Sequence, residues 1–151
     1  MDQTRREFLR ACALAGAAGL LTMSGVGCKQ DDDDGGDGGS DCPFTVDENN
    51  NVRLDLNECG ELLPDNTAIR LDGTPLGRPL LVTHTSGESF FALDSRCTHQ
   101  GCTVAATTPT LNCPCHGSRF NLSGTVNQGP AAAPLRELPL TKQGSVLIIE
   151  L

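Results

Sequence analysis

The chain carries two short boxes, Cys97-Thr98-His99-Gln100-Gly101-Cys102 and Cys113-Pro114-Cys115-His116-Gly117-Ser118, from which its fold can be predicted. They hold four of the eight cysteines and two of the three histidines in the 151-residue chain. One Cys-x-His and one Cys-x-x-His together offer two thiolates and two imidazoles, a complete set of four metal ligands. Spacings this short place the donors on loop tips, where two turns can close on one group from opposite sides.

This donor set predicts an iron–sulfur cluster. A 2Fe–2S cluster held only by thiolates has a low reduction potential, and imidazoles in place of two thiolates on one iron raise it to roughly −150 to +300 mV. Two alternatives use the same residue types: a structural zinc site, or a disulfide scaffold without metal in an exported protein. Stoichiometric zinc in a colourless protein would indicate the first of these.

The two boxes resemble those of the Rieske iron–sulfur proteins, in particular the disulfide-bearing, high-potential branch found in cytochrome bc-type complexes. The resemblance extends from Ile69 to Leu151, and Gly129-Pro130-Ala131 is similar to the proline loop that covers the cluster in that family. It implies an all-β fold, a small antiparallel Rieske-type β-sandwich with two cluster-binding loops at its tip. It also implies one 2Fe–2S cluster per chain.

The resemblance assigns roles to individual residues. By this resemblance, Cys97 and Cys113 would ligate one iron of the cofactor, and His99 and His116 would ligate the other metal ion. A disulfide between Cys102 and Cys115 would tie the two cluster loops together.

Residues around the ligands show where this chain departs from the family. Ser118 stands where the family's serine donates a hydrogen bond to a cluster sulfur, whereas Phe120 replaces a tyrosine that donates to a ligand thiolate. Losing that bond lowers the potential, so we expect a value below that of tyrosine-bearing relatives. Gln100 replaces an apolar residue at the loop tip that meets quinone sites, and Pro130 belongs to the cluster cover.

The N-terminal residues 1–28 resemble a twin-arginine (Tat) export signal, with Arg5-Arg6 before an apolar run. The alternative is an ordinary N-terminal helix. The segment would be cleaved, retained as a membrane anchor, or lipidated at Cys28, although the residues before Cys28 form a weak lipidation motif. Residues 29–41 are acidic and Gly-rich and predict a flexible linker, either a leash for the domain or a plain spacer.

The remaining length, residues 42–151, is enough for one small domain. It leaves no room for the mononuclear-iron domain of ring-hydroxylating oxygenases. The net charge of −8 argues against nucleic-acid binding and suits a basic redox partner.

Short apolar runs separated by turn residues predict antiparallel strands. They cover 44–46, 52–56, 68–71, 80–84, 89–93, 135–140 and 146–151. Cys42 and Cys59 flank the first predicted hairpin and form a candidate second disulfide. The third histidine, His84, falls in a strand away from both boxes and is expected to be an ordinary surface or edge residue.

These features predict an exported electron-transfer protein on the periplasmic side of the bacterial cytoplasmic membrane, attached to it or soluble beside it. It would have no turnover alone. The expected setting is a quinol-oxidising cytochrome bc-type complex, with cytochrome b or c partners and quinol. The alternatives are the small subunit of an arsenite-oxidase-like molybdenum enzyme, with its large subunit as partner, and a stand-alone carrier.

Overall fold

A computed structural model describes residues 40–151. The expected signal segment and nearly all of the expected linker lie outside the described residues. Within them the chain forms antiparallel sheets and one short 3₁₀ helix, η1 (Gly60–Leu62). The predicted all-β antiparallel architecture is confirmed.

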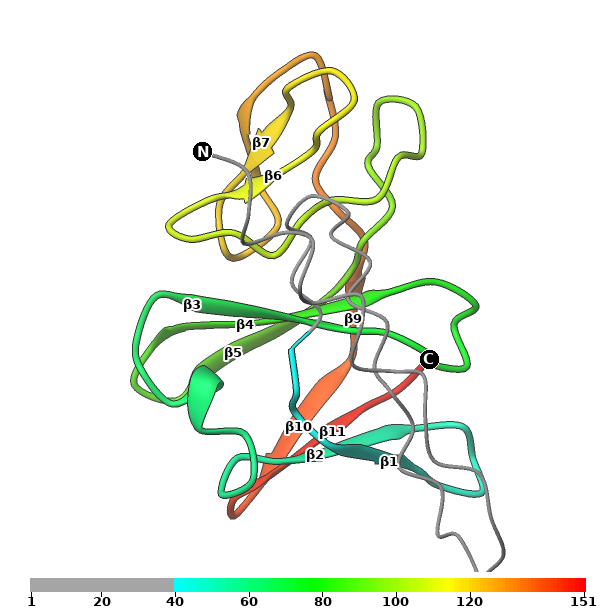
Figure 1. The fold of residues 1–151 in the computed structure, drawn as a ribbon, viewed down its shortest axis with the longest axis vertical. Coiled ribbons are helices and arrows are strands. Elements are labelled where there is room, and N and C mark those ends of the chain that lie inside the picture. Colours follow the sequence, from blue (N-terminus) through cyan, green and yellow to red (C-terminus); the bar gives the residue numbers. More distant parts are fainter. Residues whose placement is uncertain (1–39) are drawn as a thin grey trace, which may run out of the picture. The chain divides into compact units, whose positions relative to one another are not determined.

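Two four-stranded sheets form a base (residues 40–94 and 137–151), visible in the middle and lower parts of Figure 1. One sheet has the order β1-β2-β11-β10, with strands Phe44–Val46, Val52–Asp55, Val146–Ile149 and Leu140–Gln143. The other has the order β3-β4-β5-β9, with strands Thr67–Leu71, Leu80–Ser86, Ser89–Asp94 and Glu137–Leu138.

Alternation along the strands explains the core of the base. In β2, Val52 and Leu54 are fully buried while the residues between and after them are half-buried. They pair with Ile149 and Leu147 of β11, which alternate in the same way. Period-2 side chains on paired strands therefore point into one shared core.

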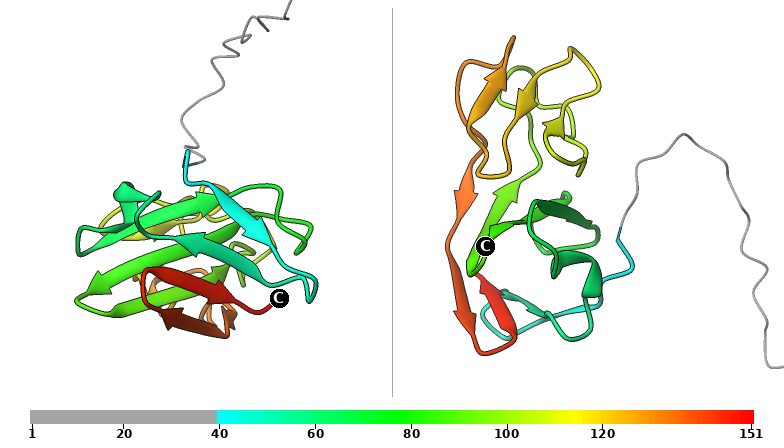
Figure 2. Two further views of the ribbon diagram at one scale, coloured as in Figure 1. Left: turned by 90° about the horizontal axis from the view of Figure 1, so that it is seen from below. Right: turned by 90° about the vertical axis from the view of Figure 1, so that its left-hand side faces the viewer.

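A third sheet, β6-β7-β8, belongs to the part of the chain that we call the tip (residues 95–136). Its strands are Leu111–Asn112, Arg119–Phe120 and Val126–Gln128. Figures 1 and 2 show the tip at one end of the base, leaving β5 and returning into β9. These strands were not predicted from the sequence, because two or three residues are too few to display an alternating pattern.

The tip has its own apolar core, which is joined to the base. Leu81 of β4 and Leu93 of β5 pack into the cluster of side chains that includes Phe120. The hydroxyl of Thr83 donates to the Leu122 carbonyl at 2.6 Å, and both residues are buried. Contacts of both kinds hold the tip to the face of the sheet that carries β4 and β5.

The segment 135–140 was predicted as one strand, and that prediction is wrong. The structure divides it into β9, in one sheet, and β10, in the other, with Pro139 between them. Proline has no N–H to continue a ladder, so the chain leaves the first sheet there and enters the second.

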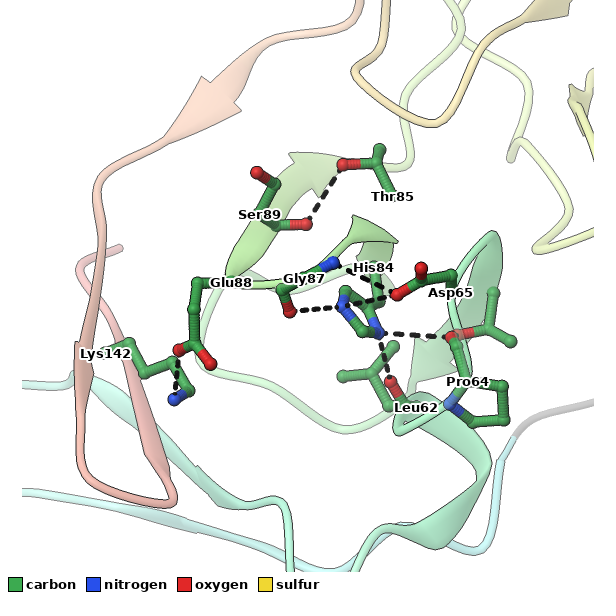
Figure 3. Close-up of polar contacts among 10 residues, drawn as sticks. Leu62, Pro64, Asp65, His84, Thr85, Gly87, Glu88, Ser89 and Lys142 are labelled. Carbon is green, nitrogen blue, oxygen red and sulfur yellow. Dashed lines mark hydrogen bonds and ion pairs between the residues drawn. The ribbon is translucent and has the colours of Figure 1, made fainter.

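The expectation that His84 is a surface or edge residue is also wrong. His84 is only 4% exposed. It belongs to β4, which lies between β3 and β5 and is therefore not an edge strand. Its Nδ1 atom lies 3.0 Å from the Leu62 carbonyl and 3.1 Å from the Pro64 carbonyl, and its Nε2 atom lies 2.8 Å from the Gly87 carbonyl. Figure 3 marks these contacts with dashed lines. The ring nitrogens therefore lie against carbonyl groups at the end of η1 and in the β4–β5 turn, a structural role within the base.

Gly124 permits the close approach of tip and base. Its φ is +82°, and a Cβ built there would lie 2.9 Å from Cδ2 of Leu93. We expect Gly124→Ala to lower the free energy of unfolding by about 2–4 kcal/mol, from the positive φ and from the clash together.

Urea unfolding measures this effect, and Gly144→Ala is the matched control. Gly144 also has a positive φ, +61°, but a Cβ there would meet nothing within 4 Å. This control should cost only about 1–2 kcal/mol. Equal losses in the two variants would show that the contact with Leu93 adds nothing.

Candidate iron–sulfur centre

The first box (Cys97–Cys102) folds back on itself in a tight loop, which we call the first box loop. The Cys97 N–H donates to the Cys102 carbonyl at 2.8 Å, and the Gly101 N–H donates to the Cys97 carbonyl at 2.8 Å. Gly101 has a φ of +78°, which glycine adopts without steric cost. The loop therefore needs glycine at its fifth position.

The second box (Cys113–Ser118) forms a loop of the same design, the second box loop. The Cys113 N–H donates to the Ser118 carbonyl at 2.8 Å, and the Gly117 N–H donates to the Cys113 carbonyl at 3.1 Å, with a φ of +74° at Gly117. Each loop thus begins at a buried cysteine and turns at a glycine four residues later. The histidine is the third residue of the first loop and the fourth residue of the second.

The two loops bring the predicted ligands together. Cys97 and Cys113 are free and buried, at 3% and 2% exposure. The His99 and His116 rings stand edge to face with centroids 4.8 Å apart. Among residues 40–151, His99 Nδ1 is the buried side-chain nitrogen or oxygen that lacks a hydrogen-bond partner.

The surroundings of the Cys113 thiol affect its ionisation. Burial raises the pKa of the Cys113 thiol. A hydrogen bond with Cys97 and the electrostatic effect of that thiol raise it further. The Cys113 thiol therefore resists ionisation in these buried surroundings. In the described part of the chain, no three His, Cys, Asp or Glu side chains converge to hold a single metal ion.

A disulfide joins the two box loops. Cys102 is bonded to Cys115 across a Cα–Cα distance of 6.5 Å. A second disulfide, Cys42–Cys59, closes the β1–β2 hairpin of the base, and both of its residues are buried. All six cysteines in residues 40–151 thus divide into two disulfides and two free thiols.

The segment 129–133, which we call the proline loop, is tied to both box loops. The Ala131 N–H donates to Ser118 Oγ at 3.0 Å, and the Thr98 hydroxyl donates to the Ala133 carbonyl at 2.6 Å. Ser118 and the run Gly129-Pro130-Ala131 stand out in the sequence, whereas nothing there indicates the contact between Thr98 and Ala133. Ala133 takes part through its backbone carbonyl, which leaves no signal in the sequence.

Comparison with known proteins identifies this architecture. The family model of the Rieske [2Fe-2S] domain matches residues 60–139, more than half of the chain. This chain belongs to the Rieske family. Rieske domains hold one 2Fe–2S cluster, and the fit of the donor set to such a cluster rests on the free thiols and on the unpaired His99 nitrogen.

Curated relatives include two different kinds of Rieske-containing protein. The carotenoid phi-ring synthase of Chlorobaculum tepidum is 47% identical over 75 residues, which are 48% of this chain and 11% of that protein. The chloroplastic iron–sulfur subunit of the cytochrome b6-f complex of Chlamydomonas reinhardtii is 43% identical over 58 residues, 37% of this chain and 28% of that subunit. The matches therefore span about a tenth to just over a quarter of these relatives.

Solved structures agree with the family assignment. The plasma membrane Rieske protein of the cyanobacterium Synechocystis PCC 6803 superposes with a TM-score of 0.50 and 28% identity, over 56% of this chain and 87% of that one. A chain of a hyperthermophilic respiratory Complex III gives a TM-score of 0.51 and 26% identity, over 63% of this chain and 71% of that one. This protein is thus a Rieske electron-transfer domain homologous to subunits of cytochrome complexes. Within residues 40–151, no helix has the length and apolar character that crossing a bilayer requires.

Proposed function

We propose that this Rieske protein carries single electrons through a 2Fe–2S cluster held by Cys97, Cys113, His99 and His116. The observation that carries the proposal is the buried, unpartnered Nδ1 atom of His99 beside two free buried thiols. A buried polar atom without a partner costs about 1–3 kcal/mol, and a bond to iron removes that cost. When bound, the cluster supplies one-electron chemistry at a potential raised by the two imidazoles.

The chain's own residues would tune and protect this centre. Ser118 is fully buried, and its oxygen accepts from Ala131, so its own O–H remains available to donate to a cluster sulfur. The proline loop is bonded to both box loops and would cover the same region. Cys97 is buried while His116 is exposed, so a redox partner reaches the centre from the histidine side.

We further propose that the protein is exported and serves a quinol-oxidising cytochrome bc-type complex. The support is the similarity to a b6-f subunit and to a Complex III chain, together with the Arg5-Arg6 pair at the N-terminus. In that setting the ring nitrogen of His116 that does not bind iron would accept the hydrogen bond and proton of a quinol hydroxyl.

Electron paramagnetic resonance on the purified protein tests both levels of this proposal. A spectrum with a low average g-value after ascorbate would establish mixed His/Cys ligation at high potential and support quinol oxidation. If the same spectrum appeared only after dithionite, the mixed-ligand cluster would be supported, but its low potential would contradict quinol oxidation. Stoichiometric zinc without a signal in any state would overturn electron transfer.

Phe120 provides a second test, because it is fully buried and packs in the same cluster of side chains as Cys97 and Cys113. We expect Phe120→Tyr to raise the reduction potential, since a new O–H would stabilise the reduced, more negative centre. About 1 kcal/mol of added stabilisation corresponds to about 40 mV for a one-electron couple.

Voltammetry of the two variants Phe120→Tyr and Phe120→Leu makes the comparison. Phe120→Leu also changes the packing but adds no donor, so it should not raise the potential. A potential unchanged by tyrosine would mean that the ring at position 120 does not face a ligand sulfur.

A further inference from the structure

The charges of the described chain divide between its two parts. The tip, residues 95–136, contains three arginines and no aspartate or glutamate. The base contains twelve acidic residues against four basic ones. Although the chain as a whole is negatively charged, the tip carries a net positive charge. The tip is also the part that carries both box loops.

A groove beside the first box loop concentrates this positive charge. It is lined by Arg78, Arg96 and Arg136, together with Asp94, residues 97–101 and Ala133. We call it the arginine groove. Arg96 and Arg136 are exposed, and within residues 40–151 neither forms an ion pair with a carboxylate.

One buried carboxylate organises the groove. Asp94, 3% exposed, accepts from Arg78 Nε at 2.6 Å and from the backbone N–H of Arg96 at 2.9 Å. Burial of this carboxyl opposes its ionisation, but the hydrogen bonds from Arg78 and Arg96 and the charges of Arg78 and Arg136 outweigh burial and lower its pKa. A single carboxylate among three guanidinium groups leaves an excess of positive charge.

The groove is also held in place next to a candidate ligand. The position a Cβ would take on Gly101 lies 3.3 Å from Arg96 Nε, so the Arg96 side chain lies over the turn of the first box loop. His99 and Gln100 line the same groove. Whatever binds the arginines therefore sits beside His99.

We propose that the arginine groove docks a carboxylate-rich surface of the protein's electron-transfer partner. Guanidinium forks bind carboxylates in a two-bonded geometry that fixes orientation as well as position. The acidic base repels the same surface and so turns the partner towards the tip. The inference rests on the proposed function. It replaces the basic partner suggested by net charge with an acidic one at the cluster end.

Two oxidants of similar potential and opposite charge test the sign of the local field. The reduced protein passes one electron to hexacyanoferrate(III), giving hexacyanoferrate(II), or to tris(phenanthroline)cobalt(III), giving the cobalt(II) complex. We expect the anionic oxidant to react faster at low ionic strength and to slow about tenfold as salt is raised. A rate with the anion that rises with salt would overturn the inference.

Matched variants locate the effect. Arg96→Gln/Arg136→Gln should remove most of the salt dependence, and Arg96→Lys/Arg136→Lys should retain it. Arg53→Gln/Lys142→Gln removes the same charge from the base and should leave the salt dependence with the anion unchanged. An equal loss in the base variant would show that net charge acts rather than the groove.

A binding measurement separates this inference from the proposed function. Isothermal titration of the protein with poly-L-glutamate at low salt should show saturable binding. The Arg96→Gln/Arg136→Gln variant should bind poly-L-glutamate about tenfold more weakly. The affinity for poly-L-lysine should be the same in the parent protein and in this variant. This measurement requires no electron transfer. Binding without a paramagnetic cluster would contradict the proposed function alone, whereas a cluster without groove-dependent binding would overturn the docking inference alone.

Discussion

His116→Cys is expected to lower the reduction potential by at least about 100 mV, roughly half of the smallest difference between two-imidazole and all-thiolate clusters, or to leave the protein without a cluster. His116 is the exposed member of the edge-to-face histidine pair, and its loop has the same backbone design as the loop that carries His99. A thiolate in its place adds negative charge to the site, which disfavours the additional electron. The shift should therefore run towards the values of all-thiolate ferredoxins, near −400 mV.

Voltammetry and paramagnetic resonance measure this change, and His84→Gln is the control. His84 is the remaining histidine of the chain, and its ring nitrogens contact carbonyl groups of the base. That variant should lose stability but keep the potential and the g-values of the parent protein. An unchanged potential and spectrum in His116→Cys would refute the assignment of His116 as a ligand.

Removing the disulfide of the tip is expected to cost about 3 kcal/mol of unfolding free energy and to expose the centre. Cys102 and Cys115 are thirteen residues apart in sequence, and a loop of about 15 residues gives that value in the chain-entropy model. This disulfide is also the covalent link between the two box loops. Its loss lets them separate locally without unfolding the base.

The variants Cys102→Ala/Cys115→Ala and Cys42→Ala/Cys59→Ala form a matched pair. The second disulfide spans seventeen residues in the base, so its removal should cost a similar free energy. Visible circular dichroism followed over hours in air should show bleaching of the cluster in the tip variant alone. Equal bleaching in both would mean that global stability, rather than closure of the box loops, protects the centre.

The sequence predicted the hairpins of the base well because their side chains alternate over four or more residues. Val52 and Leu54 of β2 and Leu147 and Ile149 of β11 show the pattern on both partners. Prediction from the sequence failed where contacts between distant parts of the chain determine the structure. Pro139 marks a change of sheet that no local pattern reveals, and the burial of His84 depends on carbonyl groups twenty or more residues away.

The candidate centre could be proposed from the sequence because the candidate ligand types are rare and closely spaced. Two cysteines and two histidines in two boxes leave few other interpretations. What could not be predicted comes from chain segments far apart in sequence. Thr98 bonds to Ala133, thirty-five residues away, and Arg78 lines a groove with Arg96 and Arg136 because Asp94 holds it there.

The path of the chain into and out of the tip makes it an exchangeable module. The tip leaves at the end of β5 and returns at β9, and these strands are direct neighbours, with Leu93 opposite Glu137. Entry and exit thus lie side by side on one ladder, where a short turn would close the base as an ordinary hairpin. Insertions or deletions in the tip that keep its contacts with Leu81 and Leu93 are therefore expected to leave the register of the base unchanged.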